Sequence, residues 1–189
     1  MWQKGYSCLI ALGSNQEWRQ HNSSEIIYES IMLISKSIGM VQRVARFYSS
    51  ESFPKGSGPD FVNTCILIRT SLSPEDILNA LHDIEKRFDR VRQQRWAPRT
   101  VDLDLVFYEQ KVFPDEATYD AWRSLSPDRQ REIAPDGLIL PHPRLQDRSF
   151  VLGPLLDIMP EWHHPVLGSN VLQMWQALAD EDRNSIWPI

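Results

Sequence analysis

Short apolar runs and segments of helical periodicity alternate along the first half of the chain. The runs are of strand length and rich in β-branched and aromatic residues, and between them apolar residues recur every three or four positions, as in amphipathic helices. This pattern predicts strands over residues 6–12, 40–48, 61–70 and from 101 onward, with helices over 22–38 and 74–88. The order strand, helix, strand, strand, helix, strand is that of the ferredoxin-like βαββαβ motif, so we expect an α+β sandwich.

Local signals mark the ends of the two predicted helices. Asn22, with Glu25 three residues later, forms a capping-box pattern, and Gly39 ends the first helix. Ser73 followed by Pro74 is a typical start for the second helix. Each helix then presents one apolar stripe, made of Ile27, Ile31, Ile34 and Ile38 in the first and of Ile77, Leu81, Ile84 and Phe88 in the second.

The second half of the chain is less regular. Residues 109–137 are longer than an ordinary connection, so we expect a surface insertion with a short helix near Tyr119 and Trp122. Residues 171–179 predict an amphipathic helix whose buried side chains are Leu172, Trp175 and Leu178.

Two carboxylates interrupt the last predicted strand. Because successive strand residues point to opposite faces, Asp102 and Asp104 should project together, away from Val101, Leu103, Leu105 and Phe107. Neighbouring like charges repel and lose hydration, and Mg²⁺ offsets both costs because it takes oxygen ligands. A solvated sheet face is the alternative interpretation of such a pair.

A basic segment precedes this pair. Residues 86–99 hold six lysines and arginines against one acidic residue, and Pro98 and Arg99 lie next to the candidate metal ligands. Such a run is usually a solvated helix end and loop, but planar guanidinium groups beside a metal site equally suit a triphosphate. We therefore weigh a phosphate site against a merely solvated loop.

Residues 95–106, RWAPRTVDLDLV, also carry a resemblance. The segment is similar to the signature of the 6-hydroxymethyl-7,8-dihydropterin pyrophosphokinase family, and the likeness extends to residues 11–15 and 148–155. The length favours a single domain over residues 1–189. The resemblance implies a ferredoxin-like core with a C-terminal extension, from which the insertion at 109–137 is a departure. It also implies an ATP-dependent enzyme of folate synthesis that transfers the β,γ-diphosphate to the pterin and releases AMP.

The same resemblance implies roles for individual residues. It implies that two Mg²⁺ ions, ATP and the reduced pterin meet in one site. By motif position, the metal ligands are Asp102 and Asp104; the catalytic arginines are Arg90, Arg92 and Arg99; the ATP contacts are Glu85, Arg99, His142 and Arg148; the pterin contacts are Phe61, Asn63 and Phe150; and Trp96 closes the loop.

The chain departs from the family pattern in the basic loop. Between Arg92 and Trp96 it is one residue shorter than the commonest form, and Gln93 stands where the family often has Lys. Pro143 replaces a common Tyr after the histidine. We expect the loop differences to affect rate and nucleotide affinity more than the type of reaction.

Composition narrows the function classes. The chain has 189 residues and a net charge of −5, which argues against nucleic acid as a partner. Cys8 and Cys65 lie in strand-like runs and are predicted to be buried free thiols. No run reaches the roughly 18 apolar residues of a membrane helix, and no secretory leader is visible. We expect a cytoplasmic monomer, in which adjacent His163 and His164 are structural.

Two other functions remain open from the sequence. One is a ferredoxin-like binding module, for example for RNA, that uses Phe61 and the arginines. The other is a degenerate relative that binds pterin without turnover. The Asp pair and the acidic balance count against the first, and intact Asp102, Asp104 and Arg99 count against the second.

Overall fold

The computed structural model describes residues 5–52, 56, 58–90, 99–126, 129, 132–135 and 137–189. Its strands are β1 (Tyr6–Ser14), β2 (Met40–Val44), β3 (Tyr48–Ser50), β4 (Phe61–Thr70), β5 (Asp102–Tyr108) and β6 (Ile186–Pro188). Its helices are α1 (Ser23–Ser37), α2 (Pro74–Arg87), α3 (Glu116–Arg123), α5 (Ser149–Ile158), α6 (Val171–Ala177) and α7 (Asp180–Asn184), with a 3₁₀ turn, η1, at Leu145–Asp147.

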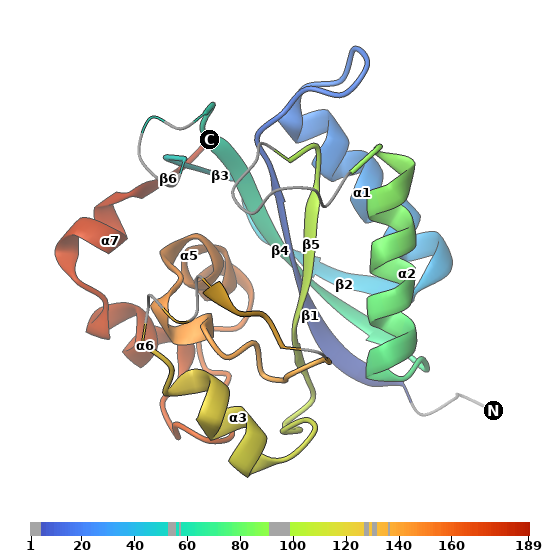
Figure 1. Ribbon diagram of the computed structural model, residues 1–189. Coiled ribbons are helices and arrows are strands. Elements are labelled where there is room, and N and C mark those ends of the chain that lie inside the picture. Colours follow the sequence, from blue (N-terminus) through green and yellow to red (C-terminus); the bar gives the residue numbers. More distant parts are fainter. Residues whose placement is uncertain are drawn as a thin grey trace.

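The strands form one antiparallel sheet (Figure 1). Its order is β5-β1-β4-β3-β6, and β2 pairs with β4 beside β3. The strand at one edge, β5, thus neighbours the first strand, and β4 lies between β1 and β2. This is the ferredoxin-like order, so the predicted α+β fold is confirmed.

Helices cover both faces of the sheet. In Figure 1, α1 and α2 lie side by side on one face, and α5 packs on the other with α6 and α7 beyond it. The face under α1 and α2 buries Ile10, Leu12 and Leu103, whereas the α5 face buries Leu9, Cys65 and other residues. Every central strand therefore has apolar residues on both sides, with opposite side chains serving different cores.

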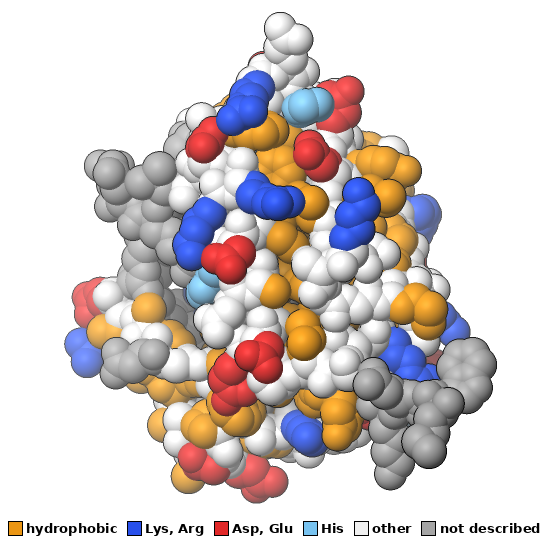
Figure 2. Space-filling view, turned by 90° about the vertical axis from the view of Figure 1, so that its right-hand side faces the viewer, with side chains coloured by type: hydrophobic (Ala, Val, Ile, Leu, Met, Phe, Trp, Pro, Cys, Tyr) orange, Lys and Arg blue, Asp and Glu red, His pale blue; other side chains and the backbone are white. Residues whose placement is uncertain are grey.

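The outer surface of α1 and α2 is mixed in character. Figure 2 shows Lys, Arg, Asp and Glu side chains scattered over this face with apolar side chains between them. The exposed apolar residues include Tyr28 and Met32 of α1, which are 65% and 44% exposed. No helix in the described ranges is long and apolar enough to cross a membrane.

The predicted helix ends are confirmed. The Asn22 side chain accepts from the backbone N–H groups of Ser24 and Glu25, and Glu25 accepts from the N–H of Asn22. Ser73 Oγ accepts from the N–H of Asp76 at 3.1 Å, with Pro74 in the first turn. The predicted stripes of both helices are buried.

Three details of the sequence prediction were wrong. The strand predicted over 40–48 is interrupted and forms β2 and β3. The register of β1 and β5 shifts between Leu9 and Ile10, a bulge that places Phe107 in the α5-side core rather than with Leu103. In α6, Leu172 is 39% exposed, because the helical stripe runs through Val171 and Met174 instead.

The insertion is anchored in the core. Its ends meet where Phe113 and Leu140 exchange two backbone hydrogen bonds of 2.8 and 3.0 Å. Helix α3 forms as predicted, and its Tyr119 is fully buried. The expected surface insertion thus contributes a core side chain.

Tyr119 reaches a buried histidine from the C-terminal part of the chain. Its hydroxyl lies 2.8 Å from Nε2 of His164, whose Nδ1 accepts from the N–H groups of Val166 and Leu167. Two donors at Nδ1 place the ring proton on Nε2, so the imidazole is neutral. Burial lowers the pKa of His164 to about 4, with a smaller contribution from Arg123. His164 is therefore structural, as expected.

This histidine should make stability depend on pH. Its pKa is about 6.5 when unfolded and about 4 when folded, so its contribution is complete above pH 6.5 and is lost as pH falls through 4. The shift corresponds to about 3 kcal/mol at most. We expect His164→Gln to be less stable than wild type at pH 7.5, and the difference in urea unfolding free energy to shrink towards pH 4. A constant difference across that range would contradict the assignment.

Candidate active site

Asp102 and Asp104 project from the α5 face of β5, as the alternation predicted. They are paired in register with Gly13 and Ala11 of β1, while the intervening Leu103 is buried on the opposite face. The side chains of Asp102 and Asp104 are 22% and 40% exposed, so solvent and ligands can reach both. Two oxygen-rich side chains share one face at the edge of the sheet.

Three arginines balance these carboxylates. Arg90 Nη2 lies 2.6 Å from Asp102 Oδ1, and Arg99 pairs with the other oxygen of Asp102. Arg148, at the start of α5, donates to Asp104 Oδ2 at 3.2 Å. The guanidinium groups come from three segments: the end of α2, the residues just before β5, and the start of α5. Their ion pairs with Asp102 and Asp104 join these segments at one point.

A third carboxylate lies beneath them. Glu85 of α2 is only 2% exposed, and its Oε1 accepts from the backbone N–H of Leu103 at 2.9 Å. The same oxygen pairs with Arg90. A buried charge needs such partners. Glu85 thus holds Arg90 against Asp102, and its predicted contact with a nucleotide stays a prediction.

The sheet register places an amide and an aromatic ring near the acid pair. Gly13 is paired with Asp102 on one side and with Asn63 of β4 on the other. Adjacent strands are about 4.8 Å apart, so Asp102 and Asn63 are about 10 Å apart in backbone position. Gly13 suits this geometry, since a Cβ there would lie 3.2 Å from Asn63 Oδ1, closer than most Cβ contacts, and in ordinary contact with the Phe61 ring at 3.7 Å.

Asn63 is held in one orientation. It is 4% exposed, and its Nδ2 donates to Ser50 Oγ of β3 at 2.9 Å. Phe61, two residues earlier, shares its face of β4 and is half-buried. The predicted pair Phe61 and Asn63 therefore lies on the same face of the sheet as Asp102 and Asp104.

Asn15 is a site residue to which sequence reasoning gave no role. It is 4% exposed, its Oδ1 accepts from the N–H of Arg99 at 2.8 Å, and its Nδ2 donates to the carbonyl of Pro59 at 3.1 Å. Its own N–H donates to the carbonyl of Arg99. One amide thus joins the turn after β1, the segment before β5 and the loop before β4. The Gly-Ser-Asn turn was the only available signal.

His142 lies beside Asp104 as a neutral group. Its backbone N–H donates to the carbonyl of Val106 at 2.7 Å, which fixes the loop along the outer edge of β5. Its Nδ1 accepts from the N–H of Arg144 at 3.1 Å, so the neutral ring carries its proton on Nε2. Burial, followed by the charges of Arg148 and Arg144, holds the pKa of His142 well below its usual range. A small pocket here is lined by Asp104, Val106, His142, Leu145, Arg148 and Val151.

Phe150 is exposed in the first turn of α5. The ring is 37% exposed, and the guanidinium carbon of Arg148 lies 5.5 Å from its centre. An aromatic residue that only filled the core would be more buried. The structure thus brings Arg90, Arg99, Arg148, Glu85 and His142 around the acid pair. Arg92 and Trp96, with predicted roles in catalysis and loop closure, lie outside the described residues.

The donor chemistry suits a divalent cation. Asp102 and Asp104 offer hard oxygen ligands on one accessible face, and Mg²⁺ often takes only one or two carboxylates together with substrate phosphates. Among the described residues no group of three or more His, Cys, Asp or Glu forms a closed metal cage. The arrangement fits a metal that shares its ligands with a substrate, surrounded by guanidinium groups able to bind phosphate.

Comparisons with known sequences agree with this chemistry. Residues 9–160 match the family model described as 7,8-dihydro-6-hydroxymethylpterin-pyrophosphokinase. The chain is 38% identical over 187 residues to a 2-amino-4-hydroxy-6-hydroxymethyldihydropteridine pyrophosphokinase of Synechocystis, covering 99% of this chain and 82% of that one. An enzyme of the same name from Bacillus subtilis is 30% identical, over 79% of this chain and 75% of its own length.

Solved structures share the fold. The wild-type HPPK-DHPS of Plasmodium falciparum superposes with a TM-score of 0.61 at 16% identity, over 92% of this chain. This chain spans 44% of that longer protein. At such low identity, the likeness concerns the fold alone.

Proposed function

Because this chain belongs to the 7,8-dihydro-6-hydroxymethylpterin-pyrophosphokinase family, we propose that its arginine-lined acid pair is the place of diphosphate transfer. The protein is an ATP-dependent pyrophosphokinase of folate synthesis. The hydroxymethyl oxygen of the pterin attacks the β-phosphorus of ATP, the bond from that phosphorus to the α,β-bridging oxygen breaks, and AMP leaves.

The site assignment rests on a row of three residues that are neighbours across the sheet. Asp102, Gly13 and Asn63 are direct neighbours in the register, so a phosphate-binding end and a heterocycle-binding end lie about 10 Å apart on one face. That separation suits a flat bicyclic ring whose hydroxymethyl group reaches the phosphates. Gly13 has no side chain, so it leaves the space between the two ends open to such a ligand.

At the phosphate end, we propose that Asp102 and Asp104 hold two Mg²⁺ ions. Bound Mg²⁺ neutralises the charge of the transferred phosphates and makes the attacking hydroxyl more acidic. The two carboxylates fit this role because both are accessible oxygen donors on the same face.

The arginines then exchange partners. Arg90, Arg99 and Arg148 are paired with carboxylates, and the oxygens of a polyphosphate offer the same guanidinium groups a second set of anionic partners. His142 adds a neutral Nε2–H donor that needs no change of protonation to contact a phosphate oxygen. Each group is preorganised where negative charge develops, which is how such sites lower the barrier.

At the pterin end, we propose that the ring stacks with Phe61 and Phe150 and that Asn63 reads its edge. An amide both donates and accepts, as the edge of a pterin requires. Arg92 and Trp96 are proposed to complete the closed site, with the loop as a lid over the phosphates. Organisation as a one-domain monomer also stays a prediction.

Product analysis tests the function directly. With ATP, Mg²⁺ and the reduced pterin, we expect AMP and pterin diphosphate in equal amounts, measured by chromatography. Asp102→Asn or Asp104→Asn should lower kcat at least about a thousandfold, or about 4 kcal/mol of barrier, because the amide keeps the shape and loses the charge. Asp83→Asn is the matched control, since Asp83 is an exposed carboxylate of α2 paired with Lys86. ADP as the product, or near-normal rates in either site variant, would refute the proposal.

The exchange of partners can be tested without turnover. Arg148→Gln frees Asp104 from its guanidinium partner, so the affinity for Mg²⁺ alone should rise about threefold, the scale of a partly exposed ion pair. The affinity for a non-hydrolysable ATP analogue with Mg²⁺ should fall in the same variant. Calorimetric titration measures both, and Arg129→Gln, which breaks an exposed pair with Glu132, is the control. Changes in the same direction for both ligands would contradict the exchange.

Phe150→Ala tests the pterin end. Loss of a stacked ring costs roughly 1–3 kcal/mol per heterocycle, so the pterin Kd should rise about 5-fold to 150-fold. The Kd of the ATP analogue should change little, because the variant retains Arg90, Arg99 and Arg148. Leu172→Ala is the control, since Leu172 is a similarly exposed apolar residue of α6. Equal losses for both ligands would assign Phe150 to packing instead.

A further inference from the structure

A segment beyond residue 160, where the match to the family model ends, completes the sheet next to the candidate pterin subsite. Strand β6 pairs antiparallel with β3, with Ser50 opposite Ile186 and Tyr48 opposite Pro188 (Figure 1). On its other side, β3 pairs with β4, where Ser50 is opposite Phe61 and Tyr48 opposite Asn63. Without β6, the three-residue strand β3 would be an open edge.

The same segment contacts the first half of α5. Ile186 is 9% exposed and so close to Gly153 that a Cβ on Gly153 would overlap Ile186 Cδ1. Next to it, Ser185 Oγ lies 3.2 Å from Ser149 Oγ. These contacts fall on either side of Phe150 along the helix. We call Ser185 and Ile186 the tail clasp.

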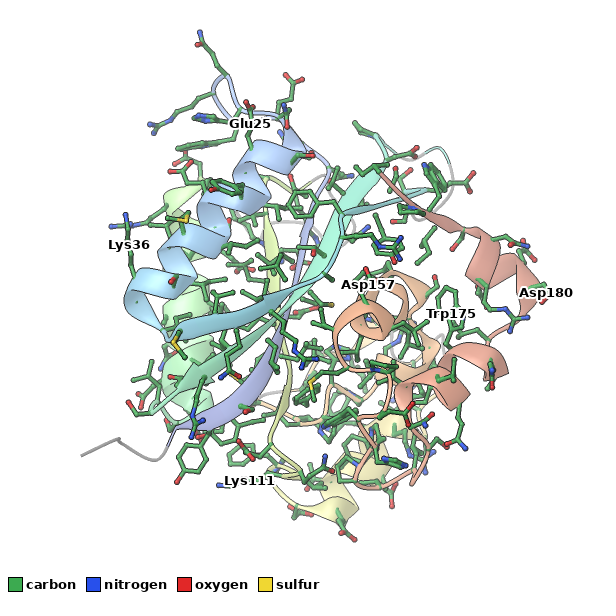
Figure 3. The ribbon with its side chains drawn as sticks, turned by 180° about the vertical axis from the view of Figure 1, so that it is seen from behind. Glu25, Lys36, Lys111, Asp157, Trp175 and Asp180 are labelled. Atoms are coloured by element: carbon green, nitrogen blue, oxygen red, sulfur yellow. The ribbon has the colours of Figure 1, made fainter. Side chains whose placement is uncertain are left out.

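The far end of α5 is held by other groups. Asp157 accepts from Arg46, with Nη2 to Oδ1 at 2.7 Å, and from the Tyr48 hydroxyl at 3.1 Å. Figure 3 labels Asp157 on α5, which packs on the opposite face of the sheet from α1, and Trp175 on α6. The helix is therefore fixed at its C-terminal end by Asp157, and its N-terminal half is fixed on the sheet side by the tail clasp.

The tail clasp thus touches α5, which carries Phe150, and β3, which is the neighbour of the strand β4 that carries Phe61 and Asn63. Through α5 it sets the place of Phe150, and through β3 it sets the place of Ser50, whose Oγ accepts from Asn63 Nδ2. We propose that Ser185 and Ile186 are positioning residues that fix the spacing between Phe150 and the Phe61–Asn63 face and so determine pterin affinity. This inference rests on the proposed function, because it assigns the two faces to one ligand.

A change at the tail clasp should alter the affinity for the pterin more than the affinity for the nucleotide. The groups at the phosphate end, Arg90, Arg99 and Asp102, meet at β5, which lies at the opposite edge of the sheet from β6. Arg148 lies at the start of α5, and it has its own hydrogen bond to Asp104. A change at the clasp should therefore raise the pterin Kd while leaving nucleotide affinity nearly constant.

A size exchange between two contacting residues tests this. Gly153→Ala pushes a methyl group against Ile186, and Ile186→Ala withdraws the contact, so each should raise the pterin Kd at least about fivefold. The double variant Gly153→Ala with Ile186→Val removes Cδ1 where the new methyl needs space, and its pterin Kd should return to within about twofold of wild type. Ser185→Ala, a milder change, should raise the pterin Kd about twofold and serves if Gly153→Ala fails to fold.

The measurements are the Kd of the reduced pterin in the presence of a non-hydrolysable ATP analogue, the Kd of that analogue, and the thermal midpoint. Trp187→Val is the control, because Trp187 points to the opposite face of β6 from Ile186. Unchanged pterin affinity with a lowered midpoint, or equal losses for both ligands, would overturn the positioning role while leaving the proposed function intact. Failure of the wild type to bind pterin would instead overturn the proposed function, and this inference with it.

Discussion

The structure depends on the balance between clustered carboxylates and the arginines that meet them. Glu85, Asp102 and Asp104 would repel one another on a partly buried sheet edge, and their charges are costly to remove from water. Three guanidinium groups offset that cost, and each comes from a different segment. The same balance that allows the acids to lie in the fold therefore fixes the geometry of the site.

This balance also supports the proposed binding of a polyphosphate at the site. Each guanidinium group needs an anionic partner, and a phosphate oxygen serves as well as a carboxylate oxygen. In the proposed exchange every charge stays compensated, because Mg²⁺ would take over the carboxylates that the arginines release. The neutral state of His142 belongs to the same arrangement, since burial and then the nearby Arg148 and Arg144 lower its pKa.

Features with a local cause were predictable from the sequence. The caps at Asn22 and Ser73, the buried stripes of α1 and α2, and the shared face of Asp102 and Asp104 all follow from interactions within a few residues. Features that depend on distant residues were not predictable from the sequence. The place of Phe107 depends on a bulge against β1, and the burial of Tyr119 depends on His164, so neither position carries a local signal. For Arg92 and Trp96, the sequence remains the only guide.

The pairing of β3 with β6 has a consequence for how the molecule is made. The two strands lie at residues 48–50 and 186–188, so during synthesis the first is delivered long before the second. At about 5–20 residues per second, the delay is on the order of ten seconds. Through that interval β3 has one bare edge, although β1, β2 and β4 have already been synthesised. The last of the six strands to be synthesised therefore closes the sheet at the side where the ring of the acceptor is proposed to bind.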